Sequence, residues 1–404
     1  MNRTTDILIA GAGPVGLALA VALAKFSDGG LSVAVVDPSL ARKRSGGRAS
    51  ALAPASRNLL DALGCWSALE PLAQPVRRME ISDSRAADAV RLPILSFEHE
   101  AGGDEIAWLA ANADIENVLR KEARALGVDL VAIASRDYRT GPNDVDLALE
   151  DGSRRRGRLL AAADGRESRL RRLAGISTIG WDYGVSGIVA TIGHERDHEG
   201  VARQHFLPAG PFAMLPLTGR RSSIVWNEPH ARARELVSLD PQSFIEELEK
   251  RFGLELGELE LLDRPAAWPL ALQVARTFSA PRLALLGDAA HVIHPIAGQG
   301  LNLAYRDVAT LAEEIIEQAR LGLDVGAPEV LANYQQRRRF DTLATGLGMD
   351  VLYRLFSNDL TPLRLARDLG MGLVDRARPI KRALMREAAG ATGSTPMLLR
   401  GEPI

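Results

Sequence analysis

The sequence predicts an α/β fold, in which a parallel-sheet domain is interrupted by an antiparallel β-sheet domain and followed by a helical C-terminal region. Three observations predict it. A strand–helix–strand pattern opens the chain, short β-rich runs fill residues 185–275, and helical spacing prevails after about residue 330.

The parallel sheet begins with the apolar run DILIA (6–10), a helical pattern over 14–26 and the run LSVAVVD (31–37). Such a βαβ unit makes parallel strands that must be covered on both faces. Two later apolar runs, LLAAAD (159–164) and LALLGD (283–288), end in the same manner. We therefore expect the chain to return to this sheet three times.

The middle of the chain predicts a second domain. The runs GIVATI, QHFLP, FAMLPL and SSIVWN are separated by Gly and Pro turns, as in an antiparallel sheet. One helix is expected among them, with Asp240 as N-cap, Pro241 as first residue and Gly253 as its stop. The predicted segments of the parallel-sheet domain are 1–77, 99–180 and 273–330, those of the inserted domain are 78–98 and 181–272, and the helical region is 331–404.

Composition excludes several classes of protein. The 404 residues have a net charge of −2, which argues against nucleic-acid binding, and a single cysteine allows no internal disulfide. We find no apolar run of about 18 residues and no signal peptide, so we expect a cytoplasmic protein. Residues 331–404 are basic, with 12 Lys/Arg against 7 Asp/Glu, and Leu365, Leu369 and Leu373 follow helical spacing there.

The motif Gly11-Ala-Gly13-Pro-Val-Gly16 lies between the first strand and the first helix, with Asp37 at the end of the second strand. In a Rossmann-like domain Gly11 permits the turn, Gly13 lets a pyrophosphate approach the helix N-terminus, and Gly16 permits close packing. Asp37 is placed to accept a hydrogen bond from a ribose. A simple tight turn is the alternative, and the motif alone does not separate NAD from FAD.

Four stretches together resemble a known family: GAGPVG, GGRASAL with Arg48, ADGRESRLRR from residue 163, and GDAAHVIHPIAGQGLNLA from 287. They are similar to the FAD-dependent aromatic-ring hydroxylases of the para-hydroxybenzoate hydroxylase type. The stretches QHFLPAGPFAMLPL and SSIVWNEP and the C-terminal region resemble the ubiquinone-biosynthesis hydroxylases within that family.

The resemblance implies an FAD site and its residues. Arg48 would lie over the pyrophosphate or the ribityl chain, although it could be a surface arginine. Asn112 would contact the ribityl or adenosine portion, or else be the N-cap of a helix over 113–125. The implied cofactor-binding residues are Gly11, Gly13, Val15, Gly16, Asp37, Arg48, Asn112, Asp164, Asp288, Gly300, Leu301 and Asn302.

Arginines follow Asp164, and they have two interpretations. They could steer a phosphorylated reductant, or they could form an ordinary solvated face. The residues concerned are Arg166, Arg169, Arg171 and Arg172.

The stretch from Asp288 to Asn302 combines a second glycine motif with a proline and two histidines. Gly298-Gln299-Gly300 brings a helix N-terminus, whose N–H groups and dipole would stabilise the negative charge of a reduced flavin. Pro295 and His294 are candidate substrate-side residues, and catalytic residues are otherwise unassigned. His291 and His294 lack a third ligand at compatible spacing, so we expect no metal, and we expect His291 to be a packed polar residue.

The implied activity is hydroxylation of a polyprenylated phenol in ubiquinone biosynthesis, with NAD(P)H as reductant and O₂ as co-substrate, through a C4a-hydroperoxyflavin. Alternatives are hydroxylation of a small soluble aromatic compound, or a non-catalytic FAD-bound component of a quinone-biosynthesis complex. Gly180-Trp181 does not continue as the motif of flavin halogenases requires. Candidate side chains for lining an apolar substrate pocket, which could equally be ordinary core, are Phe206, Phe212, Met214 and Trp226.

The implied partners are the polyprenyl phenol, subunits of a quinone-biosynthesis complex, and the inner face of the membrane through the basic C-terminal region. An amphipathic helix that covers the FAD domain is the alternative explanation of that region.

Overall fold

The computed structural model describes residues 3–42, 48–83, 93–98, 105–207, 209–253, 255–357, 377, 379, 385, 389–390 and 395–404. Part of the basic C-terminal region, including Leu365, Leu369 and Leu373, lies outside these residues. None of the helices in the described part is long and apolar enough to span a membrane.

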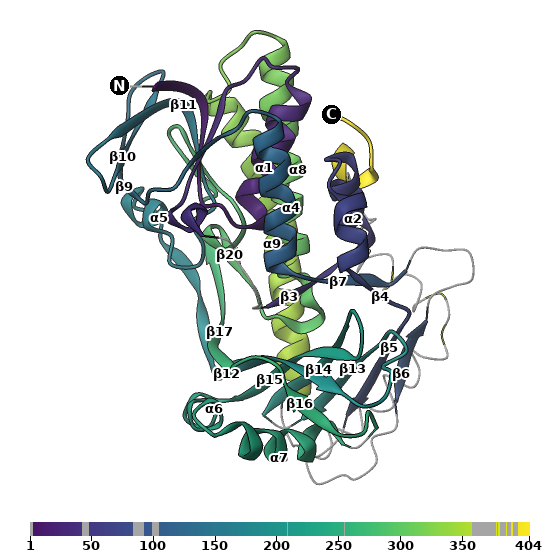
Figure 1. The fold of residues 1–404 in the computed structure, drawn as a ribbon. Coiled ribbons are helices and arrows are strands. Elements are labelled where there is room, and N and C mark those ends of the chain that lie inside the picture. The colour runs from purple at the N-terminus through teal and green to yellow at the C-terminus, as the bar shows by residue number, and fades with distance from the viewer. Residues whose placement is uncertain are drawn as a thin grey trace.

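The predicted parallel sheet forms the upper part of the molecule (Figure 1). Neighbouring strands β19, β11, β1, β2 and β8 are parallel, and β18, β10 and β9 extend the sheet through antiparallel pairs. The three predicted returns of the chain are confirmed as β1, β11 and β19. The strands are β1 (Arg3–Ala10), β2 (Val33–Val36), β8 (Asp129–Val131), β9 (Ser135–Thr140), β10 (Val145–Leu149), β11 (Arg154–Ala162), β18 (Ser279–Ala280) and β19 (Leu283–Leu285).

Helices α1, α4 and α8 pack side by side along this sheet (Figure 1). Residues 16–23 of α1 are all buried, because this helix of Gly, Ala, Leu and Val lies between the sheet and its helical neighbours. The helical segments of this part are α1 (Pro14–Phe26), η1 (Pro38–Ala41), α2 (Pro54–Ala62), α3 (Trp66–Leu69), η2 (Glu70–Leu72), α4 (Asn112–Ala125), α5 (Arg169–Leu173), η3 (Gly287–Ala289), η4 (Ile296–Gly298), α8 (Gln299–Arg320) and η5 (Met397–Arg400).

The inserted domain is a nine-stranded sheet in the order β20-β17-β12-β15-β14-β13-β5-β6, with β16 paired to β12. It is antiparallel as predicted, except that β13 and β5 pair in parallel. The strands are β5 (Arg78–Asp83), β6 (Leu95–Glu98), β12 (Thr178–His194), β13 (Val201–Leu207), β14 (Gly210–Leu217), β15 (Arg221–Pro229), β16 (Leu259–Leu261), β17 (Ala266–Ala275) and β20 (His291–Val292).

Two helices, α6 (His230–Val237) and α7 (Pro241–Phe252), cover the outer face of this sheet (Figure 1). The predicted boundaries of α7 are confirmed. The Asp240 carboxylate accepts from Ser243 N at 3.1 Å, Pro241 opens the helix, and Gly253 ends it with a φ of 77°. The expectation of one helix among these strands is wrong, because α6 forms as well, and it begins without a side-chain cap.

Three of the four candidate lining residues of the inserted sheet prove to be core. Phe212, Met214 and Trp226 are buried in a cluster with side chains of α6 and α7. Phe206 is also buried, and its ring stacks on Phe356 with centroids 4.1 Å apart. Alternation along a strand places the first three on the face turned away from the parallel sheet. For these three, ordinary core is the interpretation observed, whereas Phe206 lies on the opposite face of the sheet.

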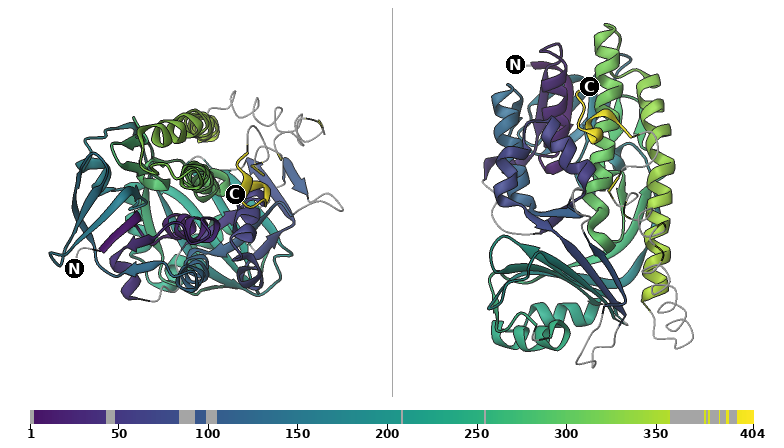
Figure 2. Two further views of the ribbon diagram at one scale, coloured as in Figure 1. Left: turned by 90° about the horizontal axis from the view of Figure 1, so that it is seen from above. Right: turned by 90° about the vertical axis from the view of Figure 1, so that its right-hand side faces the viewer.

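Long elements connect the two domains. Strand β12 runs for 17 residues through the boundary predicted at 180, and α9 (Pro328–Phe356) runs for 29 residues beside both sheets (Figure 2). A three-stranded sheet, in the order β3-β7-β4, lies between the two domains (Figure 1). Its strands are β3 (Ala49–Leu52), β4 (Gln74–Val76) and β7 (Ala107–Ala111).

Candidate active site

The candidate site lies where the carboxyl ends of β1, β11 and β19 meet. Backbone hydrogen bonds join the loops that follow these strands: Ala163 N donates to Ala10 O at 2.8 Å, and Leu286 N donates to Ala162 O at 2.9 Å. In parallel α/β sheets this edge is where ligands bind. The predicted motif residues therefore converge from three distant parts of the sequence.

The three glycines of the first motif have different surroundings. A β-carbon at Gly11, whose φ is 113°, would collide with Ala163 O, and one at Gly16 would collide with Gly11 O. At Gly13 an added β-carbon would meet no atom within 4 Å. Helix α1 begins at Gly13 without a side-chain cap. The free N–H groups of its first turn are thus uncapped beside the open space at Gly13, as an anionic phosphate requires.

Asp37 and Val15 support this loop. The Asp37 carboxylate accepts from Ala12 N at 2.8 Å and from Ser39 N at 2.7 Å, and a carboxylate has acceptor capacity left for a ribose hydroxyl. The Val15 side chain lies against Gly287, because a β-carbon there would be 3.2 Å from Val15 Cγ2. Val15 therefore brings the first motif against the loop that carries Asp288.

Asp164 has one carboxylate oxygen in use and one without a partner. Its Oδ2 accepts from Leu170 N at 3.2 Å, while its buried Oδ1 has no hydrogen-bond partner among the described residues. A buried acceptor without a donor is costly. A hydroxyl of a bound cofactor would satisfy it.

The arginines after Asp164 are mostly engaged within the protein. Arg171 is buried and donates to Ala289 O at 2.8 Å and to Arg166 O at 2.9 Å, which ties two loops of the site together. Arg169 pairs with Glu150, and Arg172 pairs with Glu167. The ordinary solvated face describes Arg169 and Arg172, but Arg171 fits neither of the two interpretations because its role is structural.

The second glycine motif opens α8. Gly298 has a φ of 64°, and an added β-carbon would be 3.0 Å from Ala51 Cβ, so a side chain is excluded there. At Gly300 an added β-carbon would meet no atom within 4 Å. Helix α8 also starts without a side-chain cap, and it presents the positive end of a 22-residue helix to this space.

Asn302 and Leu301 have structural side chains. The amide oxygen of Asn302 accepts from Ala53 N at 3.0 Å and from Ser56 Oγ at 2.7 Å, and its nitrogen donates to Ala51 O at 3.0 Å. This amide clamps β3 and α2 onto α8, so only its backbone is left for a cofactor. The Leu301 side chain packs against the main core.

A buried charged network lies behind the loop of Asp288, which is itself exposed. Asp307 is fully buried and accepts from Gly287 N at 3.0 Å, from His291 Nε2 at 2.6 Å and from Arg338 Nε at 2.7 Å. Burial alone would raise the pKa of Asp307, but His291 and Arg338 outweigh it and hold that pKa below its ordinary value. The expectation that His291 is a packed polar residue is confirmed.

Arg48 and Asn112 lie beside each other near β3. Arg48 O accepts from Asn112 N at 2.9 Å, and the Arg48 guanidinium lies 5.5 Å from the ring centroid of Trp268. The Asn112 side chain accepts from Ser50 Oγ at 2.6 Å. Asn112 is the first residue of α4, whose N-cap is Ala111, so the N-cap interpretation of Asn112 is wrong. Contact of either residue with the cofactor stays a prediction.

His294 lies in an aromatic cluster under the site, between Tyr183 of β12 and Tyr353 of α9. It stacks on Tyr353 with centroids 4.3 Å apart and meets Tyr183 edge-on at 5.1 Å. Burial lowers the pKa of His294 to about 3, although the nearby carboxylate of Asp350 acts in the opposite direction. The imidazole is therefore neutral at physiological pH. Pro295, the next residue, is exposed.

Five residues around the site were not predicted from the sequence: Asp307, Arg338, Tyr183, Tyr353 and Asn227. Asp307 could have been suspected, because it follows the second glycine motif on the same helix. The others lie far away in sequence and have no local signal. No group of three or more metal-ligating side chains occurs in the described ranges.

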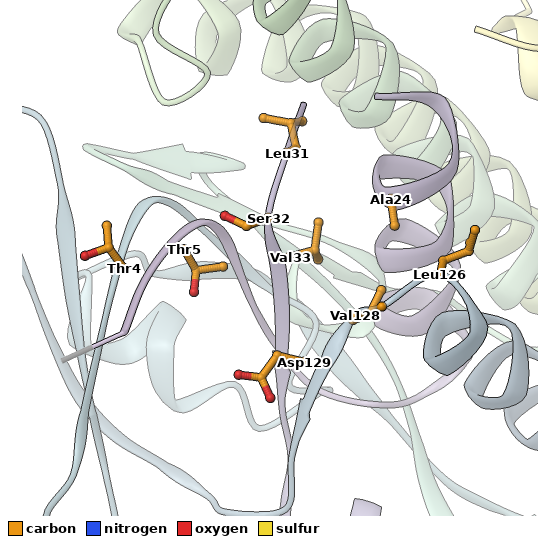
Figure 3. A pocket seen from close by; sticks show the side chains of 10 residues that line it. Thr4, Thr5, Ala24, Leu31, Ser32, Val33, Leu126, Val128 and Asp129 are labelled. Carbon is orange, nitrogen blue, oxygen red and sulfur yellow. The ribbon is translucent and has the colours of Figure 1, made fainter. Parts of the chain in front are cut away.

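A separate cavity of about 350 Å³ lies at the amino ends of β1, β2 and β8 (Figure 3). Thr4, Ser32 and Asp129 are among its lining residues. This is the sheet edge opposite to the glycine motifs, so the cavity is not part of the site.

The fold and the site together define a two-domain flavoprotein. The orphaned Asp164 oxygen, the open space at Gly13 and Gly300, and two uncapped helix N-termini all fit FAD. Residues 4–342 match the family model described as the FAD binding domain, and the chain belongs to this family of FAD-dependent monooxygenases of the para-hydroxybenzoate hydroxylase type.

Relatives match along the whole chain. It is 42% identical to the ubiquinone hydroxylase UbiL of Rhodospirillum rubrum, covering 100% of this chain and 94% of the relative. It is 35% identical to the 3-demethoxyubiquinol 3-hydroxylase of Escherichia coli, covering 96% and 99%. The solved structure of p-nitrophenol 4-monooxygenase PnpA from Pseudomonas putida shares the fold, with a TM-score of 0.79 at 20% identity over 98% of this chain and 100% of that one.

Proposed function

We propose that this protein is an FAD-dependent monooxygenase that hydroxylates the aromatic ring of a polyprenylated phenol in ubiquinone biosynthesis. The observation that carries the proposal is the match, over nearly the full length of each partner, to relatives named as ubiquinone hydroxylases. NAD(P)H and O₂ are the co-substrates typical of this family.

In this proposal the two uncapped helices contact two different parts of FAD. The start of α1 binds the pyrophosphate, and Asp37 accepts from the ribose. The start of α8, with Gly300 and Leu301, lies at the flavin ring, where its N–H groups and dipole stabilise negative charge. Asp164 Oδ1 and Asp288 accept from hydroxyl groups of the cofactor.

When bound and reduced by NAD(P)H, FAD would activate O₂, one atom of which is transferred to the ring. The chain contributes orientation and a site shielded from water. Pro295 borders the face of the ring on which the substrate lies, and neutral His294 lies on the substrate side. The inner face of the inserted sheet, opposite to α6 and α7, forms the other wall.

We further propose that α9 contacts the membrane in which a polyprenylated substrate dissolves. Its outward face carries an apolar stripe at helical spacing, in which Phe340 is 81% exposed, Leu347 50% and Val351 62%. Arg339 and Arg354 flank the stripe with positive charge. An apolar stripe with basic flanks suits an anionic lipid surface. Subunits of a quinone-biosynthesis complex are a further proposed contact.

Vesicle co-sedimentation tests this contact. The double variant Phe340→Ser, Val351→Ser should lose most of its binding to anionic vesicles. The control Leu321→Ser, which removes an equally exposed apolar side chain (70%) outside α9, should keep it. Equal binding by all three proteins contradicts the assignment of α9.

The experiment that tests the function itself is deletion of the gene followed by mass spectrometry of the accumulated quinone precursor. We expect a prenylated ring that lacks one hydroxyl group. Normal quinone production in the deletion strain would contradict the proposal.

A further inference from the structure

Asn227 of β15 is buried with its hydrogen-bonding capacity unused. It is 2% exposed, and neither its Oδ1 nor its Nδ2 has a partner among the described residues. A primary amide can accept two hydrogen bonds and donate two. Such a group in a protein interior is rare and calls for a physical explanation.

The backbone around Asn227 leaves room for this amide. Gly187 lies directly opposite it on β12, and a β-carbon there would be 3.5 Å from Asn227 Oδ1. Gly210 lies beside it, and a β-carbon there would be 3.0 Å from Asn227 Cβ. Since Trp226 points toward α6 and α7, alternation directs Asn227 to the opposite face, which is the face of the proposed substrate wall.

His294 has the same unusual property. It is fully buried, and neither ring nitrogen has a partner within the described residues. Tyr353 links it to Asn227. The Tyr353 ring stacks on His294 at 4.3 Å, and its Cε2 lies 3.5 Å from the position of a β-carbon on Gly210, beside the Asn227 amide. Two unpartnered polar side chains, from distant parts of the sequence, thus lie around one tyrosine.

The described side chains around Tyr353 and His294 are apolar or carry charges that are already paired. The apolar neighbours of Tyr353 and Tyr183 are Val185, Leu270, Ile296 and Met349. The nearby carboxylate is Asp350, whose Oδ1 accepts from Trp181 Nε1 at 3.0 Å and whose Oδ2 pairs with Arg354 at 2.9 Å. Arg354 is largely exposed, whereas this carboxylate is buried. Beside His294, a ring carboxylate would therefore meet Asp350, whose described cationic partner Arg354 is already engaged with it.

We infer that Asn227 and His294 form a neutral polar clamp that binds the oxygen substituents of an uncharged aromatic ring and disfavours a ring that carries a carboxylate. The inference rests on the proposed function and names its substrate class more closely. A neutral imidazole offers one donor and one acceptor, and the amide offers both, so together they complement phenol and ether oxygens.

The test uses the full-length, FAD-loaded protein and two ligands. One is a phenol with a short prenyl tail, and the other is the same compound with a ring carboxylate. Perturbation of the flavin absorbance gives each dissociation constant without turnover. The wild type should bind the neutral phenol at least about tenfold more tightly than the carboxylate. The variants Asn227→Leu and His294→Phe should each bind the neutral phenol about tenfold to a hundredfold more weakly.

Thermal unfolding separates a binding role from a structural one. Replacing a buried polar group that has no partner should leave the thermal midpoint of the phenol-free protein equal or higher. His205→Phe is the matched control, because buried His205 is bonded to Ser82 Oγ at 2.7 Å. It should lower the thermal midpoint and keep phenol affinity. His294→Gln, which retains a donor and an acceptor, should recover part of the affinity.

Wild-type phenol affinity in Asn227→Leu and His294→Phe would overturn the inference alone. A fall in the thermal midpoint of these two variants like that of His205→Phe would also overturn it, because Asn227 and His294 would then have a structural role. An FAD-loaded wild type that binds neither ligand would overturn the inference together with the proposed function.

Discussion

The buried carboxylate of Asp307 should be the strongest single determinant of stability behind the site. Asp307→Asn preserves the volume of the side chain but removes its charge. Three donors point at this carboxylate: Gly287 N, His291 Nε2 and Arg338 Nε. An asparagine oxygen can accept from two of them at most, and its amide nitrogen would face the third.

The expected loss of unfolding free energy follows from the burial of the Asp307–Arg338 ion pair. Arg338 is 4% exposed and, among the described residues, would retain Asp341 alone as a charged partner. Breaking a buried ion pair by removing one member costs about 3–5 kcal/mol. Because Asp307 also fixes the backbone of the loop that carries Asp288, we expect the affinity for FAD to fall about tenfold.

Urea unfolding and flavin fluorescence measure the two effects. The control is Glu317→Gln, an exposed position on the same helix, which should change the unfolding free energy by less than about 0.5 kcal/mol. An Asp307→Asn variant that loses less than about 1 kcal/mol of unfolding free energy and keeps wild-type FAD affinity would contradict this role of Asp307.

The same network predicts a pH dependence. The pKa of Asp307 in the folded protein lies below its ordinary value of 3.8. Its contribution is therefore complete above that ordinary pKa and is lost as the pH falls through it toward the lower folded value. The unfolding free energy of the wild type should decrease with falling pH in this range, and that of Asp307→Asn should decrease less steeply.

Three further outcomes follow from the geometry. Gly13→Ala and Gly300→Ala should fold normally, because the added β-carbon meets no atom, but should bind FAD at least about tenfold more weakly, whereas Gly16→Ala should lower the thermal midpoint. Asn302→Ala should lower the unfolding free energy by about 2–3 kcal/mol in urea, since a buried amide with several partners is lost. Phe212→Ala should cost about 3–5 kcal/mol and leave the FAD dissociation constant unchanged, because its ring packs toward α7.

Local patterns in the sequence were sufficient for the elements with short-range causes. The apolar run before Gly11 predicts β1, and Asp240, Pro241 and Gly253 together predict α7 to the residue. These signals work because caps, turns and strand burial depend on neighbours in the chain.

Features that depend on tertiary contacts were not predictable in this way. The parallel pairing of β13 with β5 joins segments more than 100 residues apart. Asn302 belongs to the family motif. Its neighbours in the sequence do not reveal that its side-chain amide is hydrogen-bonded to β3 and to the start of α2. The apolar character of Phe212 and Trp226 does not indicate which face of the sheet they occupy. That face is known only once α6 and α7, which pack against them, are placed.

The proposed monooxygenase activity is tested most directly by turnover under oxygen gas enriched in a heavy isotope. The FAD-loaded protein, NAD(P)H and a prenylated phenol should give a ring product that contains one labelled oxygen atom, with NAD(P)H oxidation stimulated by the phenol. An unlabelled product, or a preparation that binds FAD but never hydroxylates such a ring, would contradict the proposed monooxygenase activity.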